Sequence, residues 1–519
     1  MQFRYFRIIG DVLFVTIVTC FAVTVNAKPA DNAASNISAP EGVCRTEAKA
    51  CLALAIEAMG GKDRLQAIKS FRIDAAQHTA LVEQSYRQDP FITSYARFKQ
   101  TVDLTGQRVR IDTHMIWPES DPGQFESDAT LVVNDVGAVM RAGTHDVPAS
   151  PSDADSVRFD MKLGPLQLLL TALQAPDLHL MSPETIRSTS HAVLAFNWQE
   201  KPVRILINPF NHLPDAIETV STFSDHWYQW GDVRQRIYWD DWQVFHGIVY
   251  PLNQIEERNG ILWESTQVIA LDFNVPIDEA DFKMDADVAK KSSQSKGWES
   301  SFTAKNSTQL APGITLYPGS WNATLVQQDD GIVLLEAPLS GTYIGGVLEK
   351  TKEQYPNLPV KAVLSTSDSW PHIGGVRQTV ALGLPVYILD LNQPILDRLV
   401  AAPHTLHPDL LARSPRKPVW RLVSGKVELG KGANRMELYP LRGASTERQY
   451  MVYFPEHQLL YASDTLALNA DGSLYDPELM REVVAAVRRE NLQVKTVFAM
   501  HQGPVPWTQV TLLVEKSLN

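Results

Sequence analysis

Positive charge is in short supply in this sequence, which has 47 Lys and Arg residues against 59 Asp and Glu residues and a formal net charge of −12. No long basic run occurs anywhere along the chain. Because nucleic acids and anionic membrane surfaces attract basic proteins, this balance argues against either one as a partner.

Two common motifs built on a nucleophilic side chain are missing as well. The chain has no Gly-x-Ser-x-Gly elbow and no evident Cys/His pair, so it lacks the usual signatures of serine and cysteine hydrolases. Cysteine is scarce, with 3 residues, and neither Cys44 nor Cys51 belongs to a zinc-ribbon spacing.

What remains is the composition of a globular protein with a sizeable core. Hydrophobic residues make up 44% of the chain and charged residues 20%. A length of 519 residues favours two domains over one.

The N-terminus has the layout of a signal peptide. Arg4 and Arg7 precede an apolar run over residues 8–25, and Val25 and Ala27 suit cleavage after Ala27. A signal anchor is the alternative, because the run is nearly long enough to span a bilayer. We favour cleavage of residues 1–27, and therefore a secreted or periplasmic protein without a stable transmembrane span. The polar stretch 28–42 that follows has the composition of a disordered leader.

The state of Cys44 and Cys51 stays open at this level. On one helix they would lie about 10 Å apart, too far to form a disulfide. If Cys44 lies in an extended segment before the helix, a disulfide becomes possible, and export to an oxidising compartment favours it. Two independent thiols are the alternative.

We expect a first domain at residues 43–287 that is rich in β-structure. An Ala- and Leu-rich helix over 48–59 ends at Gly60-Gly61, and a second short helix covers 63–69. Alternating patterns predict strands, and one apolar run predicts a helix over 163–173. The predicted strands are 108–113, 129–133, 192–198, 236–242 and 262–271.

Three phrases of this domain resemble outer-membrane lipoprotein carrier proteins: MGGKDRLQAIKSFRIDA, VFHGIVYPLNQIEERNG and NVPIDEADF. The resemblance implies a curved antiparallel sheet, or half-barrel, around helices, with an apolar concave face that holds a lipid or another apolar ligand. The aromatic residues of the run 226–230, with Tyr238, Trp239 and Trp242, could line such a cavity. We favour the alternative that they are core residues, since aromatics in alternating strands normally pack against their neighbours.

A Ser- and Lys-rich stretch without periodicity, KKSSQSKGWESSFTAKNS, follows at residues 290–307. This composition is typical of a linker, which we place at residues 288–308.

The most informative stretch, LSTSDSWPHIGG at residues 364–375, lies in the second domain, expected at residues 309–519. A strand over 360–364 runs into a polar loop, and a helical pattern comes next. Upstream, a hairpin turns at Asp329-Asp330-Gly331 and a helix covers 344–353. A hairpin, a strand, a helix and then a strand ending in such a loop resemble the metallo-β-lactamase superfamily, and YASDTL and AMHQGP continue the likeness.

That resemblance implies an α+β fold of the αββα type, a two-sheet sandwich flanked by helices, with one or two metal ions. The superfamily's ligands come from a His-x-His-x-Asp-His loop, a later His, a bridging Asp and a final His. This sequence retains three of them as His372, Asp464 and His501. The other ligand positions are substituted, by Ser367, Ser369 and Pro371 in the loop and by Ser445 at the later His. Glu336 stands where the family commonly has Asp.

The three serines replace all the unique ligands of the first metal position. Because a neutral hydroxyl is a poor zinc ligand, we expect that position to be empty. The second position keeps two His and one carboxylate, a set that catalytic zinc sites use with one open position. The alternatives are one zinc ion and no metal. The loss of the carboxylate ligand at position 371, where Pro371 stands, favours no metal.

Two functions follow from these alternatives. The serines favour an exported envelope protein that is non-catalytic or weakly active, in other words a pseudoenzyme of hydrolase fold. Such a protein would bind a small-molecule or apolar ligand, or a partner. The second is a mononuclear zinc-dependent hydrolase of an ester, thioester or amide, with catalytic His372, Asp464 and His501. We expect these three side chains within about 6 Å of one another. We also expect Ser367, Ser369 and Ser445 to surround the adjacent volume.

Overall fold

The computed structural model describes residues 43–82, 91–117, 125–143, 145–319 and 321–517. The expected signal peptide, 1–27, and leader, 28–42, lie outside these residues. Residues Gly42–Asn519 form one compact unit. Among the residues that the structure describes, no helix is both long and apolar enough to span a lipid bilayer.

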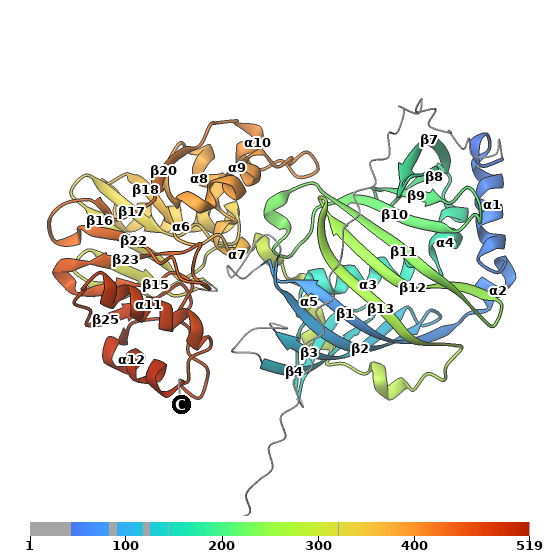
Figure 1. Cartoon of the computed structure of the whole chain (residues 1–519), viewed down its shortest axis with the longest axis horizontal. Coiled ribbons are helices and arrows are strands. Elements are labelled where there is room, and N and C mark those ends of the chain that lie inside the picture. The colour runs from blue at the N-terminus through green and yellow to red at the C-terminus, as the bar shows by residue number, and fades with distance from the viewer. Residues whose placement is uncertain (1–42, 83–90, 118–124, 144, 320, 518–519) are drawn as a thin grey trace, which may run out of the picture. The chain divides into compact units, whose positions relative to one another are not determined.

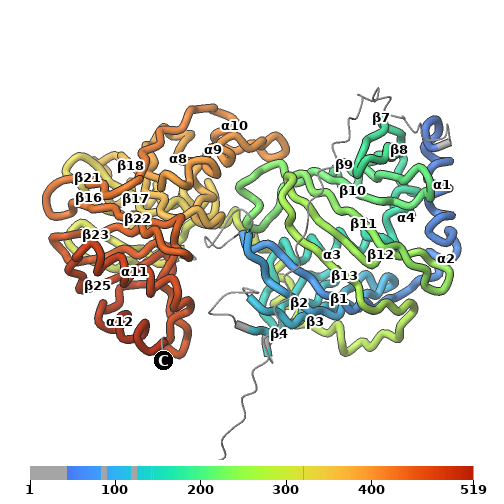
Figure 2. Tube along the Cα trace, viewed as in Figure 1, coloured from blue at the N-terminus to red at the C-terminus, as the bar shows by residue number. Residues whose placement is uncertain are grey.

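The first half of the chain is built on one 13-stranded sheet in which neighbouring strands are antiparallel (Figure 1). Their order is β6-β5-β4-β3-β2-β1-β13-β12-β11-β10-β9-β8-β7. In this order β1 lies between β2, its neighbour in sequence, and β13, which is distant in sequence (Figure 2). The strands are β1 (Ser70–Ala80), β2 (Thr93–Asp103), β3 (Arg108–Trp117), β4 (Phe125–Val133), β5 (Ala138–Ala142), β6 (His145–Pro148), β7 (His179–Ile186), β8 (Thr189–Trp198), β9 (Lys201–Ile207), β10 (Pro214–Ser221), β11 (Val233–Phe245), β12 (Ile248–Arg258) and β13 (Ile261–Phe273).

Helices α1 (Ala48–Ala58), α3 (Pro151–Leu163) and α4 (Leu168–Gln174) pack on one face of this sheet, and α2 (Lys62–Ala67) joins α1 to β1. The sheet supplies the other side of the core, because side chains along each strand alternate between its two faces. Buried examples on the inner face are Ile73, Ala75, Ile205 and Ile237. All five predicted strands lie inside observed ones. The sheet is therefore antiparallel, and helices pack on one of its faces (Figure 1).

The helix predicted over 163–173 is observed only as α4. Gly164 and Pro165 separate it from α3, because proline cannot continue a helix and Gly164 leaves the helical conformation at ψ 169°. Helix α3 is not predicted by the local pattern, because its apolar residues are few. Its N-cap is Ser150, whose hydroxyl accepts a hydrogen bond from the amide of Asp153 at 3.1 Å.

Cys44 and Cys51 form a disulfide, with a Cα–Cα distance of 4.3 Å. Cys44 lies in the short 3-10 helix η1 (Val43–Arg45), ahead of α1, so the two cysteines do not share one helix. Because they are not seven residues apart on one helix, the two cysteines come close enough to form the disulfide.

The stretch expected to be a linker is partly helical. Helix α5 (Ala286–Gln294) runs into it, and Ala289 and Ser292 are buried one turn apart. The Ser292 hydroxyl donates to the Ala149 carbonyl at 2.8 Å. Asp285 caps the helix by accepting hydrogen bonds from two amides. The N-cap and the two buried side chains stabilise this helix, which the Ser- and Lys-rich composition of the stretch does not indicate.

The second half has two sheets packed face to face, with helices on both outer sides. Side chains of both sheets fill the space between them, including Val333, Leu364, Leu438 and Phe454. The first sheet has the order β14-β15-β16-β17-β18-β19-β20, and the second β21-β22-β23-β24-β25-β26. The strands are β14 (Thr308–Ala311), β15 (Ile314–Tyr317), β16 (Ala323–Gln328), β17 (Gly331–Leu335), β18 (Val360–Ser365), β19 (Pro385–Leu389), β20 (Val419–Val423), β21 (Val427–Leu429), β22 (Met436–Pro440), β23 (Tyr450–Phe454), β24 (Leu459–Tyr461), β25 (Thr496–Phe498) and β26 (Val505–Pro506).

Helices cover the outer face of each sheet. On the first sheet they are α6 (Gly341–Gln354), α8 (Val376–Ala381) and α9 (Gln393–Ala401), with the short α7 (Trp370–Ile373) and α10 (Leu410–Arg413) nearby. On the second they are α11 (Pro477–Arg489) and α12 (Trp507–Lys516). The layers thus follow the order helix, sheet, sheet, helix.

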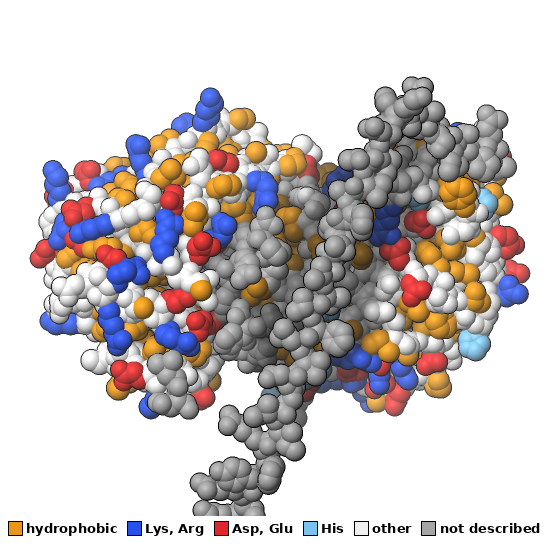
Figure 3. Space-filling view, viewed as in Figure 1, with side chains coloured by type: hydrophobic (Ala, Val, Ile, Leu, Met, Phe, Trp, Pro, Cys, Tyr) orange, Lys and Arg blue, Asp and Glu red, His pale blue; other side chains and the backbone are white. Residues whose placement is uncertain are grey.

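The aromatic run at 226–230 belongs to the core. Trp227 and Trp230 are buried, and their rings lie 4.6 and 4.8 Å from the ring of Trp370. Trp239 is also buried, and its indole N–H donates to Gln254 at 3.1 Å. On the surface of the second half, Lys and Arg side chains are interspersed with Asp and Glu on the face that Figure 3 shows.

Candidate metal centre

Three loops that follow strands bring His372, Asp464 and His501 together. His372 lies on α7, which follows β18, while Asp464 follows β24 and His501 follows β25. Strands β24 and β25 are parallel neighbours, so their carboxyl ends meet at one edge of the sheet. One potential ligand atom from each residue lies within 4.8 Å of the others.

The Asp464 carboxylate lies between the two imidazoles. Its Oδ2 is 3.1 Å from Nε2 of His372, and its Oδ1 is 3.1 Å from Nε2 of His501. The rings of the two histidines are 5.6 Å apart. His372 is 1% exposed at the side chain and His501 33%, so the cluster is buried on one side and open on the other.

These contacts move two pKa values in opposite directions. Burial alone would lower the pKa of His372, but the charge of Asp464 and its hydrogen bond outweigh this and raise it. Burial alone would raise the pKa of Asp464, but the two histidines lower it well below the usual range of an aspartate. The cluster therefore holds a carboxylate and an imidazolium at mildly acidic pH.

Hydrogen bonds below the cluster hold the loops in place. The Thr366 amide donates to a carboxylate oxygen of Glu336 at 3.1 Å, and the Thr366 hydroxyl contacts the Ser463 hydroxyl at 2.7 Å. The Tyr461 hydroxyl donates to Glu336 at 3.0 Å. Burial raises the pKa of Glu336. Glu336 and Ser463 have φ of 73° and 57°, a left-handed conformation that costs energy in non-glycine residues and is often found near functional sites.

Backbone hydrogen bonds connect the loops of Asp464 and His501 directly. The Ala462 amide donates to the Phe498 carbonyl at 2.8 Å, and the Met500 amide donates to the Ser463 carbonyl at 3.1 Å. The residues immediately before Asp464 and His501 are therefore fixed to one another.

A cavity of about 300 Å³ lies over the open side of the cluster. Its walls include aromatic rings from separate parts of the chain, and the Trp321 ring lies 5.4 Å from that of His501. The lining residues are Trp117, Trp321, Ser369, Pro371, His372, Asp464, Thr465, Ala467, Tyr475, Asp476, Leu479 and His501. A small molecule of mixed polarity would have access to the cluster from this side.

The substituted positions are distributed unevenly around this cavity. Ser369 and Pro371 line it, whereas Ser367 and Ser445 are not among the lining residues. The Ser367 hydroxyl accepts a hydrogen bond from the Ser369 amide at 3.1 Å, and the Ser445 amide donates to Glu482 at 3.0 Å.

Sequence reasoning missed several residues near the cluster. Asp368 is fully buried in the loop, 3.8 Å from Arg448, and its charge contributes to the raised pKa of His372. An acidic residue next to a buried strand was the available signal. For Trp117 and Tyr475, whose rings lie 6.1 Å apart, no local pattern pointed to the cavity.

The chain matches no family model, and it matches no curated protein in sequence. Among solved structures, the inverting sec-alkylsulfatase Pisa1 from Pseudomonas sp. is 14% identical, with a TM-score of 0.31, over 41% of this chain and 41% of its own, less than half its length. A metallo-beta-lactamase from Pontibacter korlensis is 16% identical over 41% of this chain and 99% of that one, with a TM-score of 0.32. The metallo-beta-lactamase FIM-1 from Pseudomonas aeruginosa, solved in a mono-zinc form, is 13% identical over 43% and 100%, with a TM-score of 0.33.

Proposed function

We propose that this chain is an exported hydrolase-fold protein that holds a single zinc ion at His372, Asp464 and His501 and is at most a slow hydrolase of an ester, thioester or amide. The observation that carries the proposal is the meeting of these three side chains, from three separate loops, within 4.8 Å beside a cavity of about 300 Å³. Export rests on the N-terminal sequence, residues 1–27.

The donor set suits one ion. Zinc binds nitrogen and oxygen ligands at roughly 2.0–2.2 Å, which puts neighbouring ligand atoms of a tetrahedral site about 3.3–3.5 Å apart. The two nitrogen–oxygen distances of 3.1 Å, each to a different oxygen of Asp464, are close to that range, and one ligand atom from each residue lies within 4.8 Å of the others. Three protein ligands with an open side toward a cavity is the arrangement that catalytic zinc uses.

A bound zinc ion would lower the pKa of a water molecule and polarise a carbonyl group. The protein's own residues supply the rest of the site. The Asp464 carboxylate orients both imidazoles, and the hydrogen-bonded Glu336 and Thr366 hold the loop beneath His372. Trp321 and the other rings of the cavity would contact the apolar part of a substrate.

A binding protein without metal is the second candidate, and one observation favours it. Histidines that bind metals usually donate the hydrogen of their other ring nitrogen to a carboxylate, a carbonyl or water. Nδ1 of His372 is buried and has no hydrogen-bond partner within the described part of the chain. Because no such outer-shell contact orients the ring or makes it more basic, zinc affinity at this site should be modest.

Metal analysis separates the two candidates. The purified mature protein is freed of metal with a chelator and titrated with zinc, alongside His501→Ala and the control His407→Ala, whose imidazole is exposed and outside the cluster. We expect one zinc ion per chain in wild type and control, and at least about 100-fold weaker binding in His501→Ala, since even losing an outer-shell partner costs 10–100-fold. Hydrolysis of p-nitrophenyl acetate should follow zinc occupancy. Equal zinc binding in all three proteins would show that zinc does not bind at the cluster. The metal-free candidate would then be favoured.

A further inference from the structure

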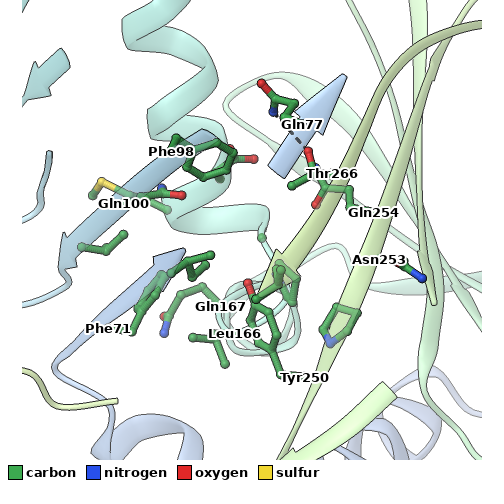
Figure 4. Close-up of a pocket in the computed structure, with 18 of the residues that line it drawn as sticks. Phe71, Gln77, Phe98, Gln100, Leu166, Gln167, Tyr250, Asn253, Gln254 and Thr266 are labelled. Atoms are coloured by element: carbon green, nitrogen blue, oxygen red, sulfur yellow. Dashed lines mark hydrogen bonds between the residues drawn. The ribbon is translucent and has the colours of Figure 1, made fainter. Parts of the chain in front are cut away.

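A second cavity lies in the first half of the chain, far in sequence from the metal centre. It is enclosed by strands β1, β2, β12 and β13 on one side and by the end of α3 and the turn before α4 on the other (Figure 4). Its volume is about 110 Å³. A cavity of about 150 Å³ holds a benzene molecule, so this one suits a ligand of roughly five non-hydrogen atoms.

The lining combines aromatic rings, amides and carboxyls, and none of the described residues that line it is Lys, Arg or His. The rings belong to Phe71, Phe98 and Tyr250, all labelled in Figure 4. Side-chain amides come from Gln77, Gln100, Gln167, Asn253 and Gln254, of which Gln77 donates to the Thr266 hydroxyl at 3.1 Å. The cavity is therefore too polar for a purely aliphatic ligand, and it offers no cation to an anionic one.

Two carboxyl groups, Asp160 and Glu264, border this cavity. Among described residues, the Asp160 side chain accepts no hydrogen bond, and Glu264 accepts one from the Thr266 hydroxyl at 3.3 Å. Burial raises the pKa of Asp160 to about 7, with a contribution from the charge of Glu256. Burial and Glu256 also raise the pKa of Glu264, to about 8. Both side chains are open to the cavity, since Asp160 is exposed and Glu264 is half-buried, so a ligand inside could contact them. Carboxyl groups with strongly shifted pKa values are enriched at binding sites.

The charges around the two carboxyls do not neutralise them. The groups that act on them are Glu256, Arg258 and, beside Asp160, the Tyr250 hydroxyl. Arg258 is already engaged, because its Nε donates to Glu256 at 2.6 Å and its guanidinium lies 4.0 Å from the centre of the Phe223 ring. Three acidic groups thus face one occupied arginine, which leaves an excess of negative charge when they ionise.

We propose that this cavity binds a small primary alkylammonium ion, with its charge at the Asp160 and Glu264 carboxyls and its alkyl chain against Phe71 and Phe98. An ammonium group donates three hydrogen bonds, which the carboxyls and the neighbouring amide oxygens can accept. Aromatic rings attract cations through their faces. The site is independent of the metal centre.

Calorimetric titration of the mature protein with butylammonium chloride tests this, with 1-butanol as the neutral ligand of equal size. At pH 9 both acids are ionised while an alkylammonium remains largely charged, so binding should be strongest there. At pH 5.5 both acids must lose a proton before they can pair with the ligand, and the affinity should fall at least tenfold. Wild type should bind butylammonium at least tenfold more tightly than 1-butanol.

Asp160→Asn should lose at least tenfold in affinity at pH 9. The matched control is Asp155→Asn, the same change at a position of the same helix that does not line the cavity, and it should bind as wild type does. No saturable binding by wild type at pH 9, equal binding of 1-butanol, or equal affinity of the two variants would each overturn the proposal. If Asp160→Asn does not fold, the comparison of ligands and pH values in wild type decides alone.

Discussion

Asp464→Asn in the metal-free protein tests the electrostatic description of the cluster. The substitution keeps the size and shape of the side chain and removes the negative charge between His372 and His501. Wild-type Asp464 accepts two contacts at 3.1 Å, one from each ring. A hydrogen bond to a charged group contributes about 1.5–3 kcal/mol, and breaking a buried ion pair costs roughly 3–5 kcal/mol. Because the asparagine oxygen can still accept one hydrogen bond, we expect a loss of about 3 kcal/mol.

The pH dependence of that loss follows from the two pKa shifts. The pKa of Asp464 is lowered in the folded protein, so its contribution to stability is present above the ordinary value of 3.8 and is lost as pH falls through the folded value. The pKa of His372 is raised, so its contribution is present below the ordinary value of 6.5 and is lost as pH rises through the folded value. The difference between wild type and Asp464→Asn should therefore be largest between about pH 4 and 6.5.

Urea unfolding followed by tryptophan fluorescence, with a chelator present, measures the free energy of unfolding at several pH values. Asp471→Asn is the control, since Asp471 is an exposed aspartate in the following loop that bonds only with Ser473 among described residues. A difference below about 0.5 kcal/mol at pH 5.5 would be no larger than that of an ordinary surface substitution. That result, or a loss that does not change with pH, would refute the proposed charge pair.

Three further outcomes are expected. Replacing Cys44 and Cys51 by serine should lower the free energy of unfolding by about 2–3 kcal/mol, the loop-closure entropy of a short disulfide loop, and thiol titration should find neither cysteine reactive in the native mature protein. Limited trypsin digestion should cut first near the exposed Lys305 and release two folded fragments; cleavage mainly within 43–287 would contradict the two-domain division. With Ser at 367, 369 and 445, zinc-loaded protein should not hydrolyse β-lactams efficiently, and rapid turnover lost in His501→Ala would show that these serines do not disable the site.

Local pattern predicted a part of the elements. Alternation of apolar and polar residues indicated the strands at 108–113 and 236–242, because a strand with one buried face must repeat every two residues. The order of strand, helix and polar loop around residues 332–375 indicated where a ligand-bearing loop would lie. The family resemblance, rather than local pattern, singled out His372, Asp464 and His501 and implied the chemistry that they could support.

Only the tertiary structure showed which other distant residues meet. Nothing near Asp160 or Glu264 in sequence shows that they border one cavity, since this depends on β1 pairing with β13 and on α3 packing against the sheet. The same holds for Trp117, which lines the cavity over Asp464. Periodicity reports which face of an element is buried, whereas the partner of that face is set by long-range packing that no short window of sequence contains.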